Sequence, residues 1–147
     1  MTIDEINREI IRQLRDGRKS FEEIAKTLSI TPNTVRARVK KLMDNGILDI
    51  TGVIDPDKLD NHFLVIIGVK LKNMNLVKKA EAFRKLRGVI SVAVVTGQFD
   101  LILTALLNNE FGLLEFMAKE VAKVSDVLST ETFVVYKNYD MKIPYTL

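Results

Sequence analysis

The sequence contains no cysteine and only one histidine among its 147 residues. Without cysteine the chain forms neither disulfides nor thiolate metal sites, and the lack of disulfides fits a reducing, intracellular environment. The single histidine, His62, has no cysteine beside it and no carboxylate cluster, so it makes a poor metal site. We therefore expect this protein to need neither a metal nor a cofactor.

Long apolar runs are also missing. The longest, residues 63–69, is far shorter than the roughly 20 residues of a membrane-spanning helix. The first 15 residues carry charges throughout and lack the apolar core of a signal peptide. Apolar residues make up 47% and charged residues 28% of the chain, which is typical of a globular protein with a real core. The sequence predicts a cytoplasmic protein of one or two small domains with no membrane segment.

The chain is mildly basic, with a net charge of +3, and part of this charge is concentrated in one short segment. Residues 36–41 contain four cations and no acid. Because a basic segment alone is usually just a solvated surface, its meaning depends on the element that presents it.

Three helices are predicted before residue 50, each with a recognisable start. The expected N-caps are Thr2 with Glu5 in a capping box, Ser20 with Glu23 in a second capping box, and Thr31 followed by Pro32. Apolar residues at helical spacing give each helix one buried stripe. The first helix is expected over residues 3–15, and the third is expected to stop at Asn45-Gly46.

The connection between the second and third helices is very short, because only Ser29 and Ile30 separate Leu28 from the cap Thr31. Such a turn forces the helices to cross steeply, and the small side chain of Ala25 allows the third helix to approach. This pattern is typical of a helix-turn-helix. Many such turns have glycine where Ser29 stands, since serine enters the left-handed conformation only at some cost.

The third helix has the composition of a DNA-recognition helix. Its buried stripe is Val35, Val39 and Leu42, which leaves a polar first turn and several cations facing outward. In a recognition helix the first turn reaches base edges, later cations contact phosphates, and helix N-termini also attract phosphate. The candidate DNA-binding residues are Ser20, Thr31, Asn33, Thr34, Arg36, Ala37, Arg38, Lys40 and Lys41. A helix-turn-helix that serves only dimerisation or structure is the alternative.

The segment after the third helix predicts a domain boundary. Residues 47–54 are expected to form a strand, which makes the helix-turn-helix winged in type, and Asp55-Pro56-Asp57 is a turn signal. We expect a DNA-binding domain over residues 1–54, a linker over residues 55–61, and a second domain over residues 62–147.

The second domain is predicted to have the order β-α-β-β-α-β. The expected strands are residues 63–72, 89–96, 101–107 and 128–139, and the expected helices are residues 75–86 and 109 or 110 to 124. This order is the ferredoxin-like arrangement, in which two helices cover one face of a four-stranded antiparallel sheet. The fold class is therefore α+β.

The strands of this domain are apolar at successive positions rather than alternate ones. Residues 63–67, 92–95 and 101–103 are apolar throughout, so both faces of the sheet need burial. Because the helices cover only one face, we infer a homodimer in which a second copy covers the other. An acid at Val65 or Val94, whichever faces outward, should then break the dimer.

Six segments match one family pattern in order and at the right intervals. They are residues 3–11, 24–26 with 31–42, 45–48, 55–59, 95–100 (V-T-G-Q-F-D) and 130–135. Together they resemble the Lrp/AsnC, or feast/famine, family over essentially the whole chain. This resemblance implies a transcriptional regulator that binds double-stranded DNA and forms homodimers, often octamers or larger discs.

The resemblance also implies an effector, because in this family amino acids or related metabolites bind between dimers. The candidate effector-binding residues are Gly97, Gln98, Phe99, Asp100, Thr130 and Thr132. Backbone N–H groups at Gly97 can hold a carboxylate, and Asp100 can accept from an ammonium group. The alternative is that Gly97 and Asp100 only shape the hairpin.

Two further alternatives belong to other classes of protein. Sirohaem decarboxylases resemble this family, but they need basic residues and histidines around a porphyrin, and this chain has only His62. No paired carboxylates, nucleophile–base set or phosphate loop is apparent, so we do not expect an enzyme. The second alternative is a metabolite-sensing module whose helix-turn-helix is vestigial.

Overall fold

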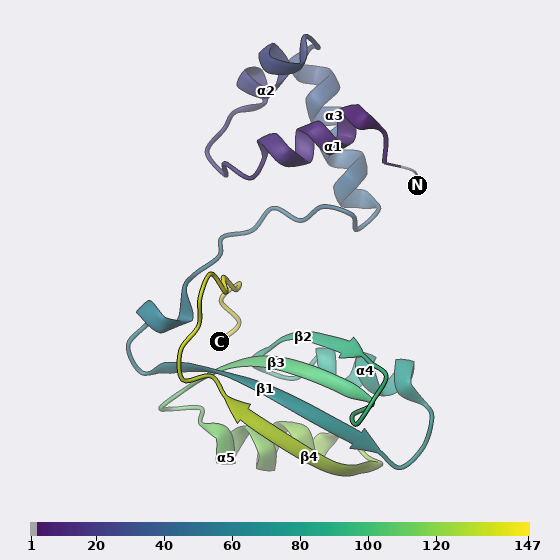
Figure 1. Cartoon of the computed structure of the whole chain (residues 1–147), viewed down its shortest axis with the longest axis vertical. Helices are drawn as coiled ribbons and strands as arrows, with labels where there is room; N and C mark the ends of the chain where they lie inside the picture. The colour runs from purple at the N-terminus through teal and green to yellow at the C-terminus, as the bar shows by residue number, and fades with distance from the viewer. Residues whose placement is uncertain (1–2) are drawn as a thin grey trace. The chain divides into compact units, whose positions relative to one another are not determined.

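The computed structural model describes residues 3–147, and they form two compact units. The first ends at Thr51 and the second begins at Gly52, so the segment expected as a linker belongs structurally to the second unit. Figure 1 shows a bundle of helices in the first unit and a sheet with helices on one face in the second.

The N-terminal unit consists of α1 (Glu5–Gln13), α2 (Phe21–Leu28) and α3 (Pro32–Asp44). Its core is small and is built from one stripe of each helix. The fully or almost fully buried apolar residues are Ile10, Ile24, Ala25, Val35, Val39 and Leu42. The three predicted helices and the buried stripe of α3 are confirmed.

Two of the three predicted N-caps are confirmed. The capping box of α2 has both of its bonds, with Ser20 N–H 2.7 Å from Glu23 Oε2 and Glu23 N–H 3.2 Å from Ser20 Oγ. Thr31 caps α3. The cap predicted for α1 is wrong: Asp4 caps this helix by accepting from the N–H of Asn7, and Thr2 lies outside the described residues. A carboxylate at residue 4 can accept from the N–H groups of the first helical turn, and its negative charge interacts favourably with the positive end of the helix dipole.

The turn between α2 and α3 has the predicted tight geometry. Ser29 has φ 55° and ψ 39°, a left-handed conformation that costs a non-glycine residue about 1–2 kcal/mol. The next residue, Ile30, donates its N–H to the carbonyl of Ala25 at 3.0 Å, which closes the end of α2. The turn that sets α3 across α2 therefore contains local backbone strain at Ser29.

The strand predicted over residues 47–54 is not formed. The strand-like pairing of this segment is limited to an isolated bridge between Ile54 and Ile143. A strand needs a neighbour for its backbone hydrogen bonds, and the described part of the chain offers no strand beside residues 47–53. Three apolar side chains here, Ile47, Ile50 and Val53, stay 37–54% exposed.

The C-terminal unit has the predicted ferredoxin-like order and belongs to the α+β class. Its elements are β1 (His62–Leu71), α4 (Leu76–Arg84), β2 (Val89–Val94), β3 (Leu101–Asn108), α5 (Leu113–Glu115) and β4 (Val127–Val134). The segment α5 continues as a π-helical turn, Phe116–Glu120, and a 3-10 turn, Val121–Lys123. The strands are antiparallel in the order β2-β3-β1-β4, with α4 and α5 on one face (Figure 1).

Two boundaries in this unit differ from the prediction by more than two residues. The second helical segment begins at Leu113 instead of residue 109 or 110, because Asn108 Oδ1 accepts the N–H groups of Glu110 and Phe111 and holds a turn there. β4 ends at Val134 instead of residue 139, because the following segment folds back over the sheet.

The odd-numbered residues of β1 face the helices. Val65, Ile67 and Val69 pack in one core with Phe83 and Phe116. The prediction that Val65 or Val94 faces outward is therefore wrong. Val65 is completely buried on the helix face, and Val94, although 48% exposed, pairs with the helix-facing Leu101. An all-apolar strand gives no alternation from which its inner face can be identified.

The opposite face of the sheet, which we call the open face, carries the even-numbered residues of β1. One end of it is covered by the chain itself: Leu64 and Leu106 are buried together with Ile143 from the C-terminal segment. The rest carries Ile66, Ile102 and the 48% exposed Phe133. The structure thus leaves a smaller apolar surface for a second copy than the sequence implied.

Ionic contacts fix the C-terminal segment to residues 55–57. Asp55 accepts from Lys142 at 2.7 Å, and Asp57 accepts from Lys137 and from the N–H of Asn138, both at 3.1 Å. The Lys142 ammonium lowers the pKa of Asp55, and the Asn138 N–H lowers that of Asp57. This aspartate–lysine clasp joins the two ends of the unit.

Candidate nucleic-acid interface and effector site

The outward face of α3 carries the predicted DNA-binding residues in an orderly arrangement. Asn33, Thr34 and Ala37 lie exposed in its first two turns, and Lys40 and Lys41 follow in the third. The helix contains no acid before Asp44. Its exposed surface is therefore polar at the N-terminal end and cationic further along, as the sequence predicted.

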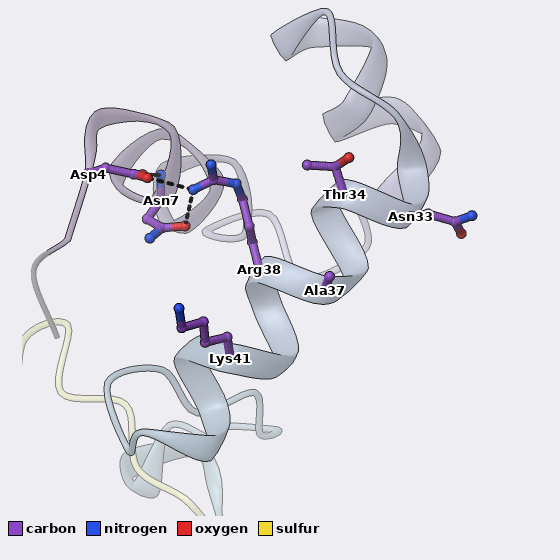
Figure 2. Close-up of a pocket in the computed structure, with 7 residues that line it drawn as sticks. All are labelled: Asp4, Asn7, Asn33, Thr34, Ala37, Arg38 and Lys41. Carbon is purple, nitrogen blue, oxygen red and sulfur yellow. Dashed lines mark hydrogen bonds and ion pairs between the residues drawn. The ribbon is translucent and has the colours of Figure 1, made fainter.

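Three of the four cations in this segment have partners within the N-terminal unit. Arg36 donates to Asn33 Oδ1 at 2.8 Å, and Lys40 pairs with Asp44 at 2.6 Å. Arg38 donates from one nitrogen to Asp4 at 2.7 Å and to Asn7 at 3.0 Å (Figure 2). Among the described residues, Lys41 has no ion-pair partner.

The contact of Arg38 with Asn7 is partly buried, whereas its bond to Asp4 is exposed, as are the contacts of Arg36 and Lys40. The side chain of Arg38 is 30% exposed, and Asn7 beneath it is only 3% exposed. The bond from Arg38 is the main reason why the pKa of Asp4 lies below its usual value. Arg38 therefore fastens the start of α1 to the middle of α3, a role that sequence reasoning missed because residues 4 and 38 are far apart in the chain.

A groove of about 900 Å³ runs beside α3. Its lining residues are Asp4, Asn7, Asn33, Thr34, Ala37, Arg38 and Lys41. Figure 2 shows these side chains on α3 and at the start of α1, with the dashed contacts of Arg38 on one side of the groove. Two cations and one acid give this surface a net positive charge, which suits a polyanion.

Ser20 and Thr31 lie at the N-termini of α2 and α3, where they are occupied as caps. Thr31 Oγ1 accepts from the N–H of Thr34 at 3.2 Å and lies 2.8 Å from the Thr34 hydroxyl. Thr31 is thus hydrogen-bonded to Thr34, which lines the groove, whereas Ser20 belongs to a different helix and does not line the groove.

The candidate effector residues of the β2–β3 hairpin lie at one end of the sheet. Gly97 is exposed and has φ +120°, a conformation that favours glycine. The Asp100 carboxylate accepts from Leu71 N–H at 2.8 Å and from Lys70 Nζ at 3.2 Å. These contacts lower the pKa of Asp100, and the bond from Leu71 N–H has the largest effect. The carboxylate is therefore charged at neutral pH.

Phe99 lies on the open face, directly over Gly68 of β1. A Cβ atom at residue 68 would lie 2.6 Å from the Phe99 ring, so only glycine leaves room for the ring in this position. The hairpin residues thus have a structural role in the loop. This agrees with the alternative that Gly97 and Asp100 shape the hairpin. The partly buried carboxylate of Asp100 and the ammonium group of Lys70, a residue that sequence reasoning missed, still lie side by side with opposite charges.

Thr130 and Thr132 do not join the hairpin residues in a single pocket. They pair with Val69 and Ile67 of β1, so their side chains share the helix face, and β1 separates them from the hairpin. Within this chain the candidate effector residues therefore lie near the same end of the sheet, but on opposite sides of β1. Among residues 3–147 no cluster of three His, Asp or Glu residues could hold a metal ion.

In the part of the chain that the structure describes, no helix has both the length and the apolar character that crossing a membrane requires.

The fold combines a helix-turn-helix with a separate ferredoxin-like unit. A family model for the AsnC-type helix-turn-helix domain matches residues 3–43, and one for the Lrp/AsnC ligand-binding domain matches residues 64–144. These two domains define a DNA-binding transcriptional regulator that senses a small molecule. The chain belongs to the Lrp/AsnC family.

A sequence relative agrees with this assignment, and two solved structures agree with the fold. An uncharacterised helix-turn-helix-type transcriptional regulator of Pyrococcus furiosus is 31% identical, over 90% of this chain and 91% of its own. The crystal structure of a protein named PH0061 has a TM-score of 0.83 at 20% identity, covering 97% of this chain and 99% of that one. A transcriptional regulator from Neisseria meningitidis, solved as a complex with L-Met, has a TM-score of 0.72 at 23% identity, covering 99% and 96%.

Proposed function

We propose that this regulator binds operator DNA by placing α3 in the major groove, with the first two turns of the helix against base edges. The observation that carries this proposal is the exposed face of α3, which is polar at its start and cationic further along, beside a positively charged groove. Arg36, Lys40 and Lys41 contact phosphates, as do the N-termini of α2 and α3 at Ser20 and Thr31. Arg38 contributes through the position it gives to α3.

The proposal includes a homodimer formed through the open face. Ile66, Ile102 and Phe133 share this face by strand register, and none of them is covered by the C-terminal segment in the way Leu64 is. Removing such side chains from water contributes about 25 cal/mol per Å². Two copies of α3 can then reach two half-sites about 34 Å apart along the duplex. We propose regulation without a catalytic step.

Lys41→Gln tests the DNA-binding proposal. Lys41 has no intramolecular ion pair in the described chain, so the variant should keep its fold while one phosphate is no longer neutralised. We expect weaker binding and a slope of log affinity against log salt that is shallower by about 0.9 for each subunit, or about 1.8 for the proposed dimer, since each subunit loses one phosphate contact. Titration of duplex DNA at several salt concentrations measures both quantities.

The control is Lys85→Gln, which removes another exposed lysine, this one from the C-terminal unit. This variant should leave the salt slope unchanged. An unchanged slope in Lys41→Gln as well would contradict the assignment of this face to DNA.

We also propose that the effector is an amino acid bound beside the β2–β3 hairpin. Asp100 and Lys70 present a carboxylate and an ammonium group 3.2 Å apart, which matches the two charges of a zwitterion. The exposed backbone at Gly97 and the polar side chain of Gln98 adjoin this pair. Phe99 supplies an apolar surface, and a neighbouring dimer can bring Thr130 and Thr132 to the ligand from the other side of β1.

Asp100→Asn should remove the response to the effector. Asparagine keeps an oxygen that can accept from Leu71 N–H, so the hairpin retains its anchor, but the charge that attracts an α-ammonium group is removed. In a panel of the common amino acids we expect at least one to change the operator affinity of the wild type by about 5- to 150-fold, a typical allosteric coupling. An Asp100→Asn protein that responds fully to the same amino acid would refute this site.

A further inference from the structure

On the outward face of α3, three cations are engaged in intramolecular contacts. Arg38 is bound to Asp4 and Asn7, and Lys40 is bound to Asp44. Arg36 is turned toward Asn33. The centre of the face, between these cations, is occupied by the amide of Asn33 and the methyl group of Ala37.

Asn33 and Ala37 are four residues apart, so they lie one above the other on the same side of the helix. Both are exposed, and both line the groove beside α3. Figure 2 shows Ala37 between Asn33 and Lys41 along α3. The helical rise separates them by roughly 6 Å, which is close to two base-pair steps of about 3.4 Å each.

Each of these side chains matches one base in the major groove. An asparagine amide pairs with adenine by accepting from N6 and donating to N7, and an alanine methyl packs against the methyl group of thymine. Arg36 donates to Asn33 Oδ1 at 2.8 Å, which fixes the amide while leaving its N–H groups and one oxygen lone pair for a base.

Guanine is usually read by arginine or lysine. Arg36 donates to Asn33 and, in the proposed complex, to a phosphate, and Arg38 is held by Asp4. Building on the proposed DNA-binding function, we propose that Asn33 and Ala37 are the specificity-determining residues, and that Arg36 positions Asn33. Asn33 reads an adenine, and Ala37 contacts a thymine methyl group within two base pairs of it, in each half-site.

The experiment begins with selection of binding sites from a random duplex pool by the full-length wild-type protein. We expect symmetric half-sites in which one adenine and one thymine are fixed within two base pairs of each other. Asn33→Ala should lose about tenfold or more of its discrimination at the adenine alone, since a bidentate contact supplies that selectivity. Lys85→Gln serves as the control and should select the same site as the wild type.

The methyl contact is tested by replacing the fixed thymine with deoxyuridine, which removes one methyl group and keeps the base pairing. Wild-type affinity should fall about three- to fivefold, the effect of one buried methyl group. In Ala37→Gly the same replacement should have no effect, and this comparison cancels any general loss of helix stability.

Four outcomes would count against these assignments. If the wild type selects half-sites without such an adenine and thymine, or if Asn33→Ala keeps the wild-type specificity, the inference is overturned while DNA binding by α3 stands. Equal sensitivity of wild type and Ala37→Gly to deoxyuridine removes Ala37 from the proposal. If no duplex binds even at low salt, the proposed function fails together with this inference.

Discussion

Ile102→Asp is expected to turn the proposed dimer into a monomer. Ile102 lies in the middle of the open face, between Gly68 on β1 and Ala93 on β2, where a second copy would cover it. A two-fold interface would bury the new carboxylate twice, and each buried, unpaired charge costs several kcal/mol. Because 1.4 kcal/mol is a factor of ten, the dissociation constant should rise at least about a hundredfold.

Analytical ultracentrifugation over a concentration series measures this change directly. Val77→Asp is the matched control, because Val77 is 73% exposed on α4, away from the open face, and the same charge there should leave the dimer intact. Operator affinity should also fall by about a hundredfold or more in Ile102→Asp, since linked half-site contacts depend on the dimer. An Ile102→Asp protein that sediments as a dimer would show that another surface holds the subunits together.

Ile24→Ala is expected to unfold the N-terminal unit selectively. Ile24 is completely buried in a small core that has six buried apolar side chains among the described residues, and truncating such a side chain costs about 2–5 kcal/mol. A unit of this size has little stability in reserve. We therefore expect a loss of helical circular dichroism and of DNA binding, while the C-terminal unit still forms the dimer and still binds the effector.

Ile24→Val provides the graded control, because removing one methylene typically costs about 0.5–1.5 kcal/mol. It should lower the unfolding temperature of the first transition and retain operator binding. If Ile24→Ala instead abolished dimerisation together with DNA binding, the two units would not be energetically separate.

Local signals in the sequence predicted most of the secondary structure correctly. Ser20, Thr31 and Gly46 act within a few residues of themselves, so their roles at helix ends can be read without tertiary information. The β-α-β-β-α-β order follows from apolar segments and turns in the same way. The segment at residues 47–54 has strand composition, but a strand also needs a neighbour, and composition does not say whether one is present.

Contacts between residues that are distant in the chain could not be predicted from the sequence. The side chain of Arg38 has the position of a DNA contact on a helical wheel, and only its bonds to Asp4 and Asn7 assign it to the α1–α3 contact. Likewise, nothing in β1 distinguishes Val65 from Ile66 until the packing of Phe83 defines the inner face.

The same limit applies to the candidate effector site. The residues of the hairpin could be identified from the turn itself, because Gly97 and Asp100 have recognisable turn chemistry. The involvement of Lys70, and the separation of Thr130 from the loop by β1, depend on strand register. Register is set by the whole sheet, so a short motif does not contain it.

The aspartate–lysine clasp has a consequence for evolution. Asp55 and Lys142 are separated by 87 residues, yet they form one charge pair, as do Asp57 and Lys137. Loss of an aspartate would leave a lysine without its partner, and a lysine at residue 57 could not accept the N–H group of Asn138. Relatives should therefore tend to keep or lose the two members of each pair together, and such coupled substitutions would show which sequences fasten residues 55–57 to the end of the fold in this way.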